Sequence, residues 1–228
     1  MIAAGFWQRY AAWSLDAALL AVPTAALAAP SVAAHAHVLG DLGQALLQRI
    51  YTTLAEHLLQ AESLPAAVAA VLHDPALAPA LTATHAALLQ LLLAPTAAFV
   101  LLGALYHAVA EASPWQGGAG KRALGLAVSD RRGARLDVGR AGLRHLAGGL
   151  SWLTLNLGHL LAAVAPAHRA LHDRFSGTQV MALSGSRRLP AWARLWLGIQ
   201  VIAAVAASAW LGLLTAAMAQ RALEAALR

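Results

Sequence analysis

The chain has 228 residues, of which 60% are hydrophobic and 11% are charged. Soluble domains carry roughly 25% charged residues, so this composition excludes an ordinary soluble fold and indicates a bilayer protein. The net charge of +6 arises from sixteen Lys and Arg against ten Asp and Glu. Because no basic stretch carries a nucleic-acid-binding motif, we expect no nucleic-acid partner and attribute the excess to loops beside anionic lipid.

The first long apolar stretch runs from about residue 11 to residue 32. Arg9 stands at its entrance and Asp16 lies inside it, about two helical turns apart on one face. A signal peptide with TAALAAPS as its cleavage site is the alternative reading. We favour a retained transmembrane helix bent near Pro23, because a single Arg precedes the stretch and Asp16 interrupts it.

Residues 33–85 form an arm that is rich in Ala and Leu but not continuously apolar. Residues 39–62 repeat apolar positions at helical spacing, and the segment that follows Pro65 predicts a short helix ending at Pro75. The arm contains one Arg and no Lys, which suits the non-cytoplasmic side of a membrane. Packing on the protein and lying at the membrane surface both fit this pattern.

The second apolar stretch, residues 86–110, leads into a basic loop at residues 111–138. Seven Lys and Arg fall within residues 113–144, namely Lys121, Arg122, Arg131, Arg132, Arg135, Arg140 and Arg144. The positive-inside rule therefore predicts that this loop and the N-terminus are cytoplasmic. Within the loop, LGLAVSDRRGARLDV alternates and turns at residues 130–133, which predicts a short β-hairpin holding the only strands of the chain.

The third apolar segment, residues 138–166, is long enough to span a bilayer but is weakened by Gly148, Gly149, Asn156 and Gly158. Five arginines follow it, and a full crossing would place them outside, against the positive-inside rule. We favour a bent or re-entrant hairpin over a simple crossing. The last stretch, residues 195–218, is unbroken and predicts a further transmembrane helix.

These segments predict an all-α polytopic membrane protein. We expect three to four transmembrane helices, the third segment being re-entrant in the three-helix case. A helical extracytoplasmic arm and a short cytoplasmic β-hairpin complete the expected fold.

The motifs of common catalytic and metal sites are missing from the sequence. GGAGKR resembles a phosphate-binding loop but has Trp115 where the first Gly belongs and Arg122 where Ser or Thr belongs. There is no Cys, no HExxH and no GxSxG, so we expect neither an enzyme nor a cofactor. His35, His37 and Asp41 are weak metal-ligand candidates, since their spacing matches no compact ligand pattern and favours surface histidines.

Three stretches add a more specific signal: RYAAWSLD (9–16), SPWQGGAGKRALGLAVSDRRG (113–133) and HRALHDRFSGTQVM (168–181). In this order they resemble the RDD family of bacterial membrane proteins, named after an Arg and an Asp in the first helix and a later Asp. The matching residues are Arg9, Asp16 and Asp173. The resemblance covers residues 5–183 and implies a multi-pass protein of the bacterial inner membrane. We expect a membrane domain at residues 1–183 and an additional transmembrane helix and tail at residues 184–228.

The resemblance implies little chemistry, because most members have no settled function and some resemble proteins linked to sodium/proton exchange. A small transporter would use Asp16 as a buried acid with Arg9 and Asp173, and would be a homo-oligomer. The alternative is a non-transporting scaffold or accessory factor that binds a partner protein, with these residues as a structural ion-pair network. The residues favour the structural role, and for His172 they favour a helix cap over a proton relay.

Overall fold

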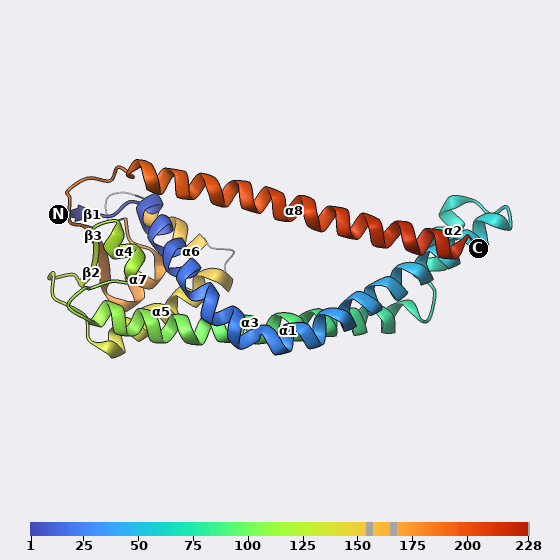
Figure 1. The fold of residues 1–228 in the computed structure, drawn as a ribbon, viewed down its shortest axis with the longest axis horizontal. Coiled ribbons are helices and arrows are strands. Elements are labelled where there is room, and N and C mark those ends of the chain that lie inside the picture. The colour runs from blue at the N-terminus through green and yellow to red at the C-terminus, as the bar shows by residue number, and fades with distance from the viewer. Residues whose placement is uncertain (154–156, 165–167, 228) are drawn as a thin grey trace. The chain divides into compact units, whose positions relative to one another are not determined.

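The computed structural model describes residues 1–153, 157–164 and 168–227. Three helices are long and apolar enough to cross a membrane: α1 (Phe6–Leu59), α3 (Leu77–Ala112) and α8 (Ala191–Ala226) (Figure 1). They contain the first, second and last apolar stretches, so these three stretches form helices of the predicted length and apolar composition. No other helix in the described ranges meets these criteria.

Helix α1 joins two segments that the sequence predicts separately, the first apolar stretch and the arm helix at residues 39–62. Pro23 does not end it, since the helix continues on both sides of this residue. Ala and Leu, both strong helix formers, dominate the 54 residues and offset the cost of the two interior prolines, Pro23 and Pro30. Helix α3 likewise continues through Pro95.

The chain folds into two compact units. Unit 1 comprises Met1–Ala26 and Ala97–Gln200, and unit 2 comprises Leu27–Thr96 and Val201–Arg228. Both are discontinuous in sequence, because α1, α3 and α8 each contribute residues to both.

Unit 2 contains the predicted arm. Its short helix α2 (Leu64–Leu72) is capped by Ser63, whose hydroxyl oxygen accepts a hydrogen bond from the Ala66 amide. Arg49 of α1 donates from Nη2 to Asp74 Oδ1 at 2.8 Å, which ties the segment after α2 to α1. This exposed pair contributes little to stability by itself but sets where the chain turns back toward α3.

A three-stranded antiparallel sheet lies in unit 1, so the fold is not purely helical. Its strands are β1 (Ile2–Ala3), β2 (Leu126–Asp130) and β3 (Thr178–Ala182), in the order β1-β3-β2. Leu126 pairs with Ala182 and Asp130 with Thr178. The sheet therefore joins the N-terminus, the basic loop and the segment after Asp173.

The predicted β-hairpin is not confirmed, because β2 pairs with β3 and not with residues 134–138. Asp130 Oδ1 accepts hydrogen bonds from the amides of Arg132 and Ala134, both at 2.8 Å, and makes the predicted turn. Asp137 Oδ1 then accepts from the Arg140 amide at the start of α5 (Val138–Leu153). The residues after the turn therefore lead into a helix instead of a second strand.

Unit 1 also contains four short elements: α4 (Ala119–Ala123), α6 (Leu157–Leu160), the 3₁₀ turn η1 (Leu161–Ala163) and α7 (Leu171–Ser176), of which α4 and α7 contact the sheet. Helix α5 packs on α7. The apolar core of unit 1 joins the sheet to α1 through Leu126, Val128, Val180, Ala11 and Ala12, all nearly or fully buried. Because alanines line this face of α1, the helix approaches the sheet and α4 closely.

Candidate functional site

A line of alternating charges runs through the interior of unit 1. We call it the charge network, and it comprises Asp16, Lys121, Glu111, Arg144, Asp173 and Arg9. Helices α1, α3, α4, α5 and α7 each contribute at least one member. With three acids and three bases the network is formally neutral, and each charge faces one of opposite sign.

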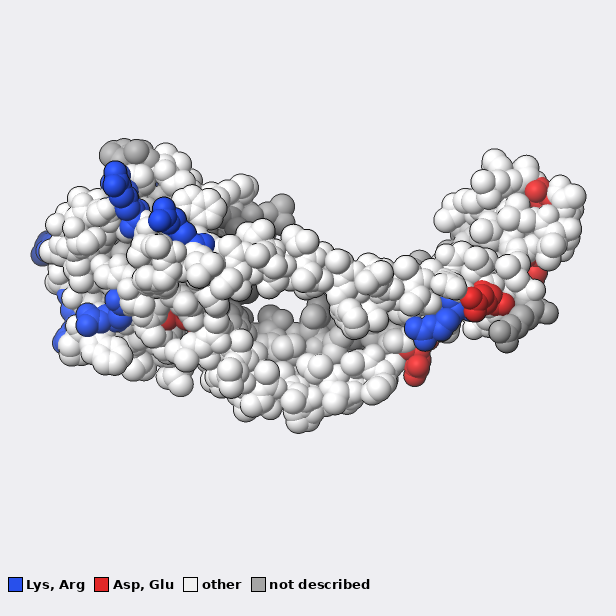
Figure 2. Space-filling view, turned by 45° about the horizontal axis from the view of Figure 1, so that its top comes forward, with Lys and Arg blue, Asp and Glu red and all other residues white. Residues whose placement is uncertain are grey.

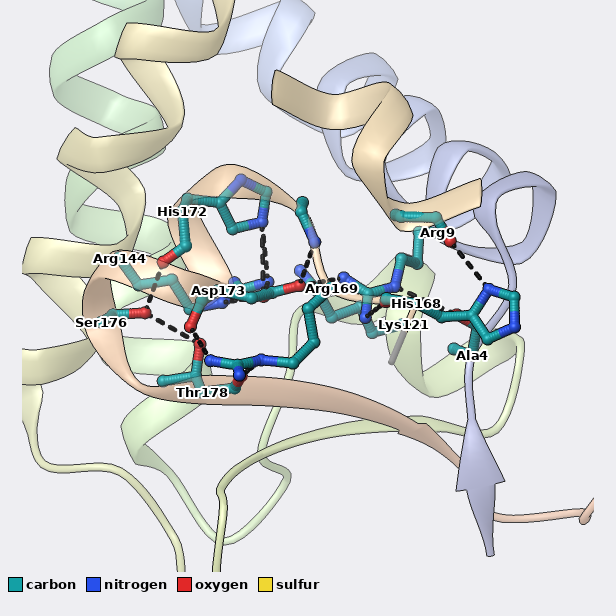
Figure 3. A network of polar contacts seen from close by, with 12 residues as sticks. Ala4, Arg9, Lys121, Arg144, His168, Arg169, His172, Asp173, Ser176 and Thr178 are labelled. Carbon is teal, nitrogen blue, oxygen red and sulfur yellow. Dashed lines mark hydrogen bonds and ion pairs between the residues drawn. The ribbon is translucent and has the colours of Figure 1, made fainter. Parts of the chain in front are cut away.

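Asp173 of α7 lies between Arg9 and Arg144 in the network (Figure 3). Its Oδ2 forms an ion pair with Arg9 Nη1 and accepts from the Ala170 amide at 2.9 Å, while Oδ1 lies 3.1 Å from Arg144 Nη2. Burial alone would raise the pKa of Asp173, but the Arg144 and Arg9 guanidiniums hold it well below its usual range. The carboxylate is thus ionised, enclosed and fully hydrogen-bonded.

Arg144 of α5 stands at the centre of the network. Its Nη1 donates to both carboxylate oxygens of Glu111, at 2.6 and 2.9 Å, and its Nε and Nη2 donate to Asp173. Nη2 also lies 3.2 Å from His172 Nε2, which accepts in a neutral imidazole. One guanidinium therefore connects α3, α5 and α7, using the fork geometry that favours arginine for buried pairs.

Lys121 continues the network toward α1. Its Nζ lies 3.1 Å from Glu111 Oε1 and 4.0 Å from Asp16 Oδ2. The second distance is beyond hydrogen-bond range, so Asp16 Oδ2 has no hydrogen-bond partner in the described part of the chain. The contact between Asp16 and Lys121 is the longest link in the network.

Asp16 also binds the start of α4. Its Oδ1 accepts from the Tyr106 hydroxyl and from the Gly120 amide, both at 2.7 Å, and the Tyr106 oxygen accepts from the Ala119 amide at 2.6 Å. A Cβ on Gly118 would lie 2.7 Å from Asp16 Oδ2, and one on Gly120 would overlap the Ala12 carbonyl oxygen. The GGAGKR segment is glycine-rich because α1 lies directly against it.

The structure separates Arg9 and Asp16, which the sequence places on one helical face. Arg9 pairs with Asp173, while Asp16 contacts α3 and α4 at the other end of the network. His172 does not cap α7; that role belongs to Asp173, which accepts from the Ala170 amide. Burial, reinforced by Arg144, lowers the pKa of His172 to about 3, so the imidazole is neutral near pH 7.

Sequence reasoning missed Glu111, Lys121 and Arg144 as members of the site. Glu111 could have been predicted as a member, because it is the one acidic residue within helix α3 and acids inside a membrane need partners. Lys121 and Arg144 could not, since each stands among the basic residues that the positive-inside rule already explains.

The weak metal candidates lie in α1, where His35 Nδ1 donates to the Ser31 carbonyl oxygen at 2.7 Å. Among the described residues no three or more His, Cys, Asp or Glu side chains are grouped so as to hold a metal ion. His35, His37 and Asp41 are therefore not brought together into a ligand set.

A cavity of about 670 Å³ lies beside the charge network, within unit 1. Its polar lining comprises Arg9, His107, Glu111, Lys121, Arg144, His145, His159 and His172. Most of its remaining wall is apolar and comes from α1, α3, α5 and α6. The rings of His107 and His145 stack with centroids 5.1 Å apart, and those of His159 and His172 lie 5.3 Å apart.

Three apolar helices of membrane-spanning length, two of which (α1 and α3) contribute to the buried charge network, define this protein as a helical membrane protein. The chain belongs to the RDD family, whose model matches residues 3–177. This confirms the resemblance drawn from the three sequence stretches. Helix α8 lies entirely outside the matched region, which ends before the first residue of this helix, Ala191.

One curated relative is the uncharacterized protein YxaI of Bacillus subtilis (strain 168). It is 33% identical over 82 residues, which represent 36% of this chain and 54% of YxaI. The chain thus matches about half the length of that relative. No solved structure gives a significant match.

Proposed function

We propose that this chain is a non-enzymatic membrane scaffold or accessory protein, in which the charge network holds the helices of unit 1 together. The observation that carries the proposal is the enclosure of its acids: Asp16 and Asp173 are 0% exposed and Glu111 is 1% exposed. To exchange an ion, a transporter needs a carboxylate that can separate from its cationic partner and become accessible to water. Here the acids sit among fixed cations and hydrogen-bond donors from four helices, α1, α3, α4 and α5.

Charge distribution supports a placement in the bacterial inner membrane with the N-terminus in the cytoplasm. Thirteen of the sixteen Lys and Arg belong to unit 1, against five of the ten acids. By the positive-inside rule, the loops of unit 1 are cytoplasmic and the arm at residues 33–85 is on the opposite side. Helices α1, α3 and α8 then cross the membrane, and the C-terminus lies opposite the N-terminus.

The third apolar segment, in this proposal, does not cross. Helix α5 has 16 residues and a length of about 24 Å, less than the ~30 Å hydrocarbon core. Arg140 and Arg144 of α5 bind residues 173–177, so the chain after the segment returns to the same helix. Residues 154–156 and 165–167 of this segment lie outside the described ranges.

The surface for a partner protein, or for anionic lipid headgroups, is the basic surface of unit 1. Figure 2 shows Lys and Arg side chains gathered on this unit, whereas most of the surface of the long helices is uncharged. Eight exposed arginines belong to it: Arg122, Arg131, Arg132, Arg135, Arg174, Arg187, Arg188 and Arg194. Arg131 and Arg132 stand on the exposed turn after β2, where a partner has unobstructed access.

Exchange of a monovalent cation for protons is the second candidate. It is favoured by the loose end of the network, where Asp16 Oδ2 has no hydrogen-bond partner among the described residues and Lys121 Nζ is 4.0 Å away. A small cation entering there would bind Asp16 and displace Lys121 toward Glu111. Three transmembrane helices are too few to form a moving transport pathway within one chain. A homo-oligomer would then provide a mobile interface between subunits.

Ion flux in vesicles separates the two functions. The purified chain is reconstituted with an internal pH-sensitive dye, a pH gradient is imposed, and Na⁺ or K⁺ is added outside. The scaffold proposal predicts that vesicles with the wild-type chain, with Asp16→Asn and without protein all dissipate the gradient at the same rate. A cation-dependent rate in the wild type that disappears in a folded Asp16→Asn variant would establish exchange instead.

Partner binding is tested by cross-linking in membranes. A protein that cross-links to the wild type is expected to be lost with Arg131→Glu/Arg132→Glu. The matched control is Arg188→Glu/Arg194→Glu, which removes the same charge from exposed positions outside the turn. Equal loss in both double variants would assign the contact to general electrostatic attraction and contradict a binding surface at the turn.

A further inference from the structure

The cavity of unit 1 has a polar end and an apolar side. Its volume of about 670 Å³ lies within the range of ligand sites in proteins. The charged residues at its polar end come from α1, α3, α4 and α5, and four histidines stand beside them. Such a division suits a ligand that is itself divided into a polar head and an apolar body.

The charges that face the cavity are not balanced, although the network as a whole is neutral. Arg9, Lys121 and Arg144 line the wall, and among the described residues Glu111 is the one carboxylate that lines it. Asp16 and Asp173, which complete the network, do not contribute to the wall. The surface seen by a ligand therefore carries three cations against one anion, which favours an anionic head.

Lys121 has the hydrogen-bonding capacity to receive that head. An ammonium carries three N–H donors, and Glu111 Oε1 lies at 3.1 Å while Asp16 Oδ2 is too far for a hydrogen bond. Arg144, by contrast, directs its donors at Glu111, Asp173 and His172. The lysine is thus the cation best placed to bind a new anion without breaking an existing pair.

The apolar side of the cavity is lined by exposed side chains from the apolar helices α1 and α3 and from the shorter helices α5 and α6. Trp13 of α1 is 38% exposed and Val100 of α3 is 40% exposed, while Leu146 and Leu160 are 64% and 47% exposed. Exposed apolar side chains around a cavity mark an entrance that faces hydrocarbon more favourably than water. An acyl chain entering between them would reach the charged end without crossing an aqueous phase.

We propose that this cavity binds an anionic membrane lipid, with the headgroup at Lys121 and an acyl chain along Trp13, Val100 and Leu146. The site goes beyond the scaffold role, since a scaffold needs no internal ligand. It selects lipids by headgroup charge, and a zwitterionic lipid of the same chain length binds more weakly because its own ammonium is repelled by the lysine.

Quenching of Trp13 fluorescence tests the site. The full chain is reconstituted in phosphatidylcholine containing a small fraction of brominated-chain phosphatidic acid, or the same fraction of brominated phosphatidylcholine. We expect the anionic lipid to quench at about tenfold lower concentration, and this excess to disappear in Trp13→Phe. Equal quenching by the two brominated lipids would overturn the proposal.

A matched pair of glycines on α5 provides the cavity control. Gly148 lines the cavity and a Cβ there meets no atom closer than His172 Nδ1 at 4.0 Å, so Gly148→Leu fills the space. Gly142 is on the same helix, has open space around its Cβ and does not line the cavity. The excess quenching by the anionic lipid should be lost in Gly148→Leu and kept in Gly142→Leu. Loss in both variants would contradict the proposal that the lipid binds in this cavity.

Two further measurements keep the test decisive if Gly148→Leu fails to fold. Lys121→Gln is expected to reduce the preference for the anionic lipid to less than about twofold while Trp13 is still quenched by it. Free inorganic phosphate, added in competition, should not restore the fluorescence of Trp13. Competition by phosphate at the concentration of the lipid would show a headgroup site without an acyl-chain site and would overturn the proposal.

Discussion

Asp173 illustrates how buried charges are tolerated in unit 1. Its carboxylate is held by two guanidiniums and one backbone amide, so almost every lone-pair direction is satisfied. Desolvating an ion costs several kcal/mol, and only such complete pairing offsets that cost. The three residues that carry the resemblance to the family are therefore members of one network of six, and their contacts depend on partners from α3, α4 and α5.

Replacing Asp173 with Asn should destabilise the protein by about 3–5 kcal/mol, because Arg9 and Arg144 would keep their charges with one acid fewer. The double variant Arg9→Gln/Asp173→Asn should be less destabilised than the sum of the two single variants. The denaturation midpoint in detergent measures both effects. Strict additivity would contradict direct coupling between the two side chains.

Gly120 makes a sharp steric prediction. A Cβ at this position overlaps the Ala12 carbonyl oxygen of α1 and lies 3.0 Å from the Leu15 Cβ, and the Ala12 backbone cannot move aside without displacing α1. Gly120→Ala should therefore lower the melting temperature and weaken the Asp16 contact with α4. Gly142→Ala, in open space on α5, is the control, and it should raise the stability by about 0.5–1 kcal/mol through helix propensity.

Helix α7 shows how a short element acquires its position from others. It has six residues, begins with the Asp173–Ala170 cap and ends at Gly177, whose φ of 65° lies in the left-handed region. Arg140 of α5 donates to the carbonyl oxygens of Ser176 and Gly177, and so binds the end of the helix. Isolated helices of this length are unstable, so α7 exists because α1 and α5 bind it.

The buried His172 of this helix should make the stability of the protein depend on pH. Burial lowers its pKa to about 3 from an ordinary 6.5, and burial also lowers the pKa of His159. Between pH 3 and 6.5 the unfolded chain binds more protons than the folded chain, so the free energy of unfolding falls as the pH is lowered through this window. Above pH 6.5 the histidine contributes no slope.

The variant His172→Gln should remove up to about 1.4 kcal/mol per pH unit of that slope, the value for one proton. Thermal melting in detergent at pH 4, 5, 6 and 7.5 measures it, with His73→Gln in unit 2 as the exposed control. An unchanged slope in His172→Gln would show that His172 is not the residue responsible.

At the scale of the whole molecule, three apolar helices and an uneven charge distribution predict one topology. Because the chain has no cysteine, single substitutions at exposed positions report on one site each. Arg132→Cys should react with an impermeant maleimide only from the cytoplasmic side, and Gln60→Cys and Ala225→Cys only from the other side. Labelling of Ala225→Cys on the same side as Arg132→Cys would require an even number of crossings and would contradict the three-span topology.

Much of the architecture is encoded locally. The apolar runs predict the three spanning helices, since length and hydropathy are properties of a continuous segment. Arg9, Asp16 and Asp173 also stand out in the sequence as charges close to apolar runs. The Asp130 turn was likewise predictable, because an Asp side chain hydrogen-bonds to nearby amides.

Only the tertiary structure decided which residues pair. Arg9 meets Asp173 across 164 positions and Arg144 meets Glu111 across 33, and nothing local distinguishes Arg144 or Lys121 from the other basic residues. The choice of β3 over a hairpin as the partner of β2 is equally non-local, because it depends on Asp137 starting a helix. The length of an apolar helix is determined by the sequence of its own segment. Charge pairing and strand pairing instead depend on which segments the folded chain brings into contact.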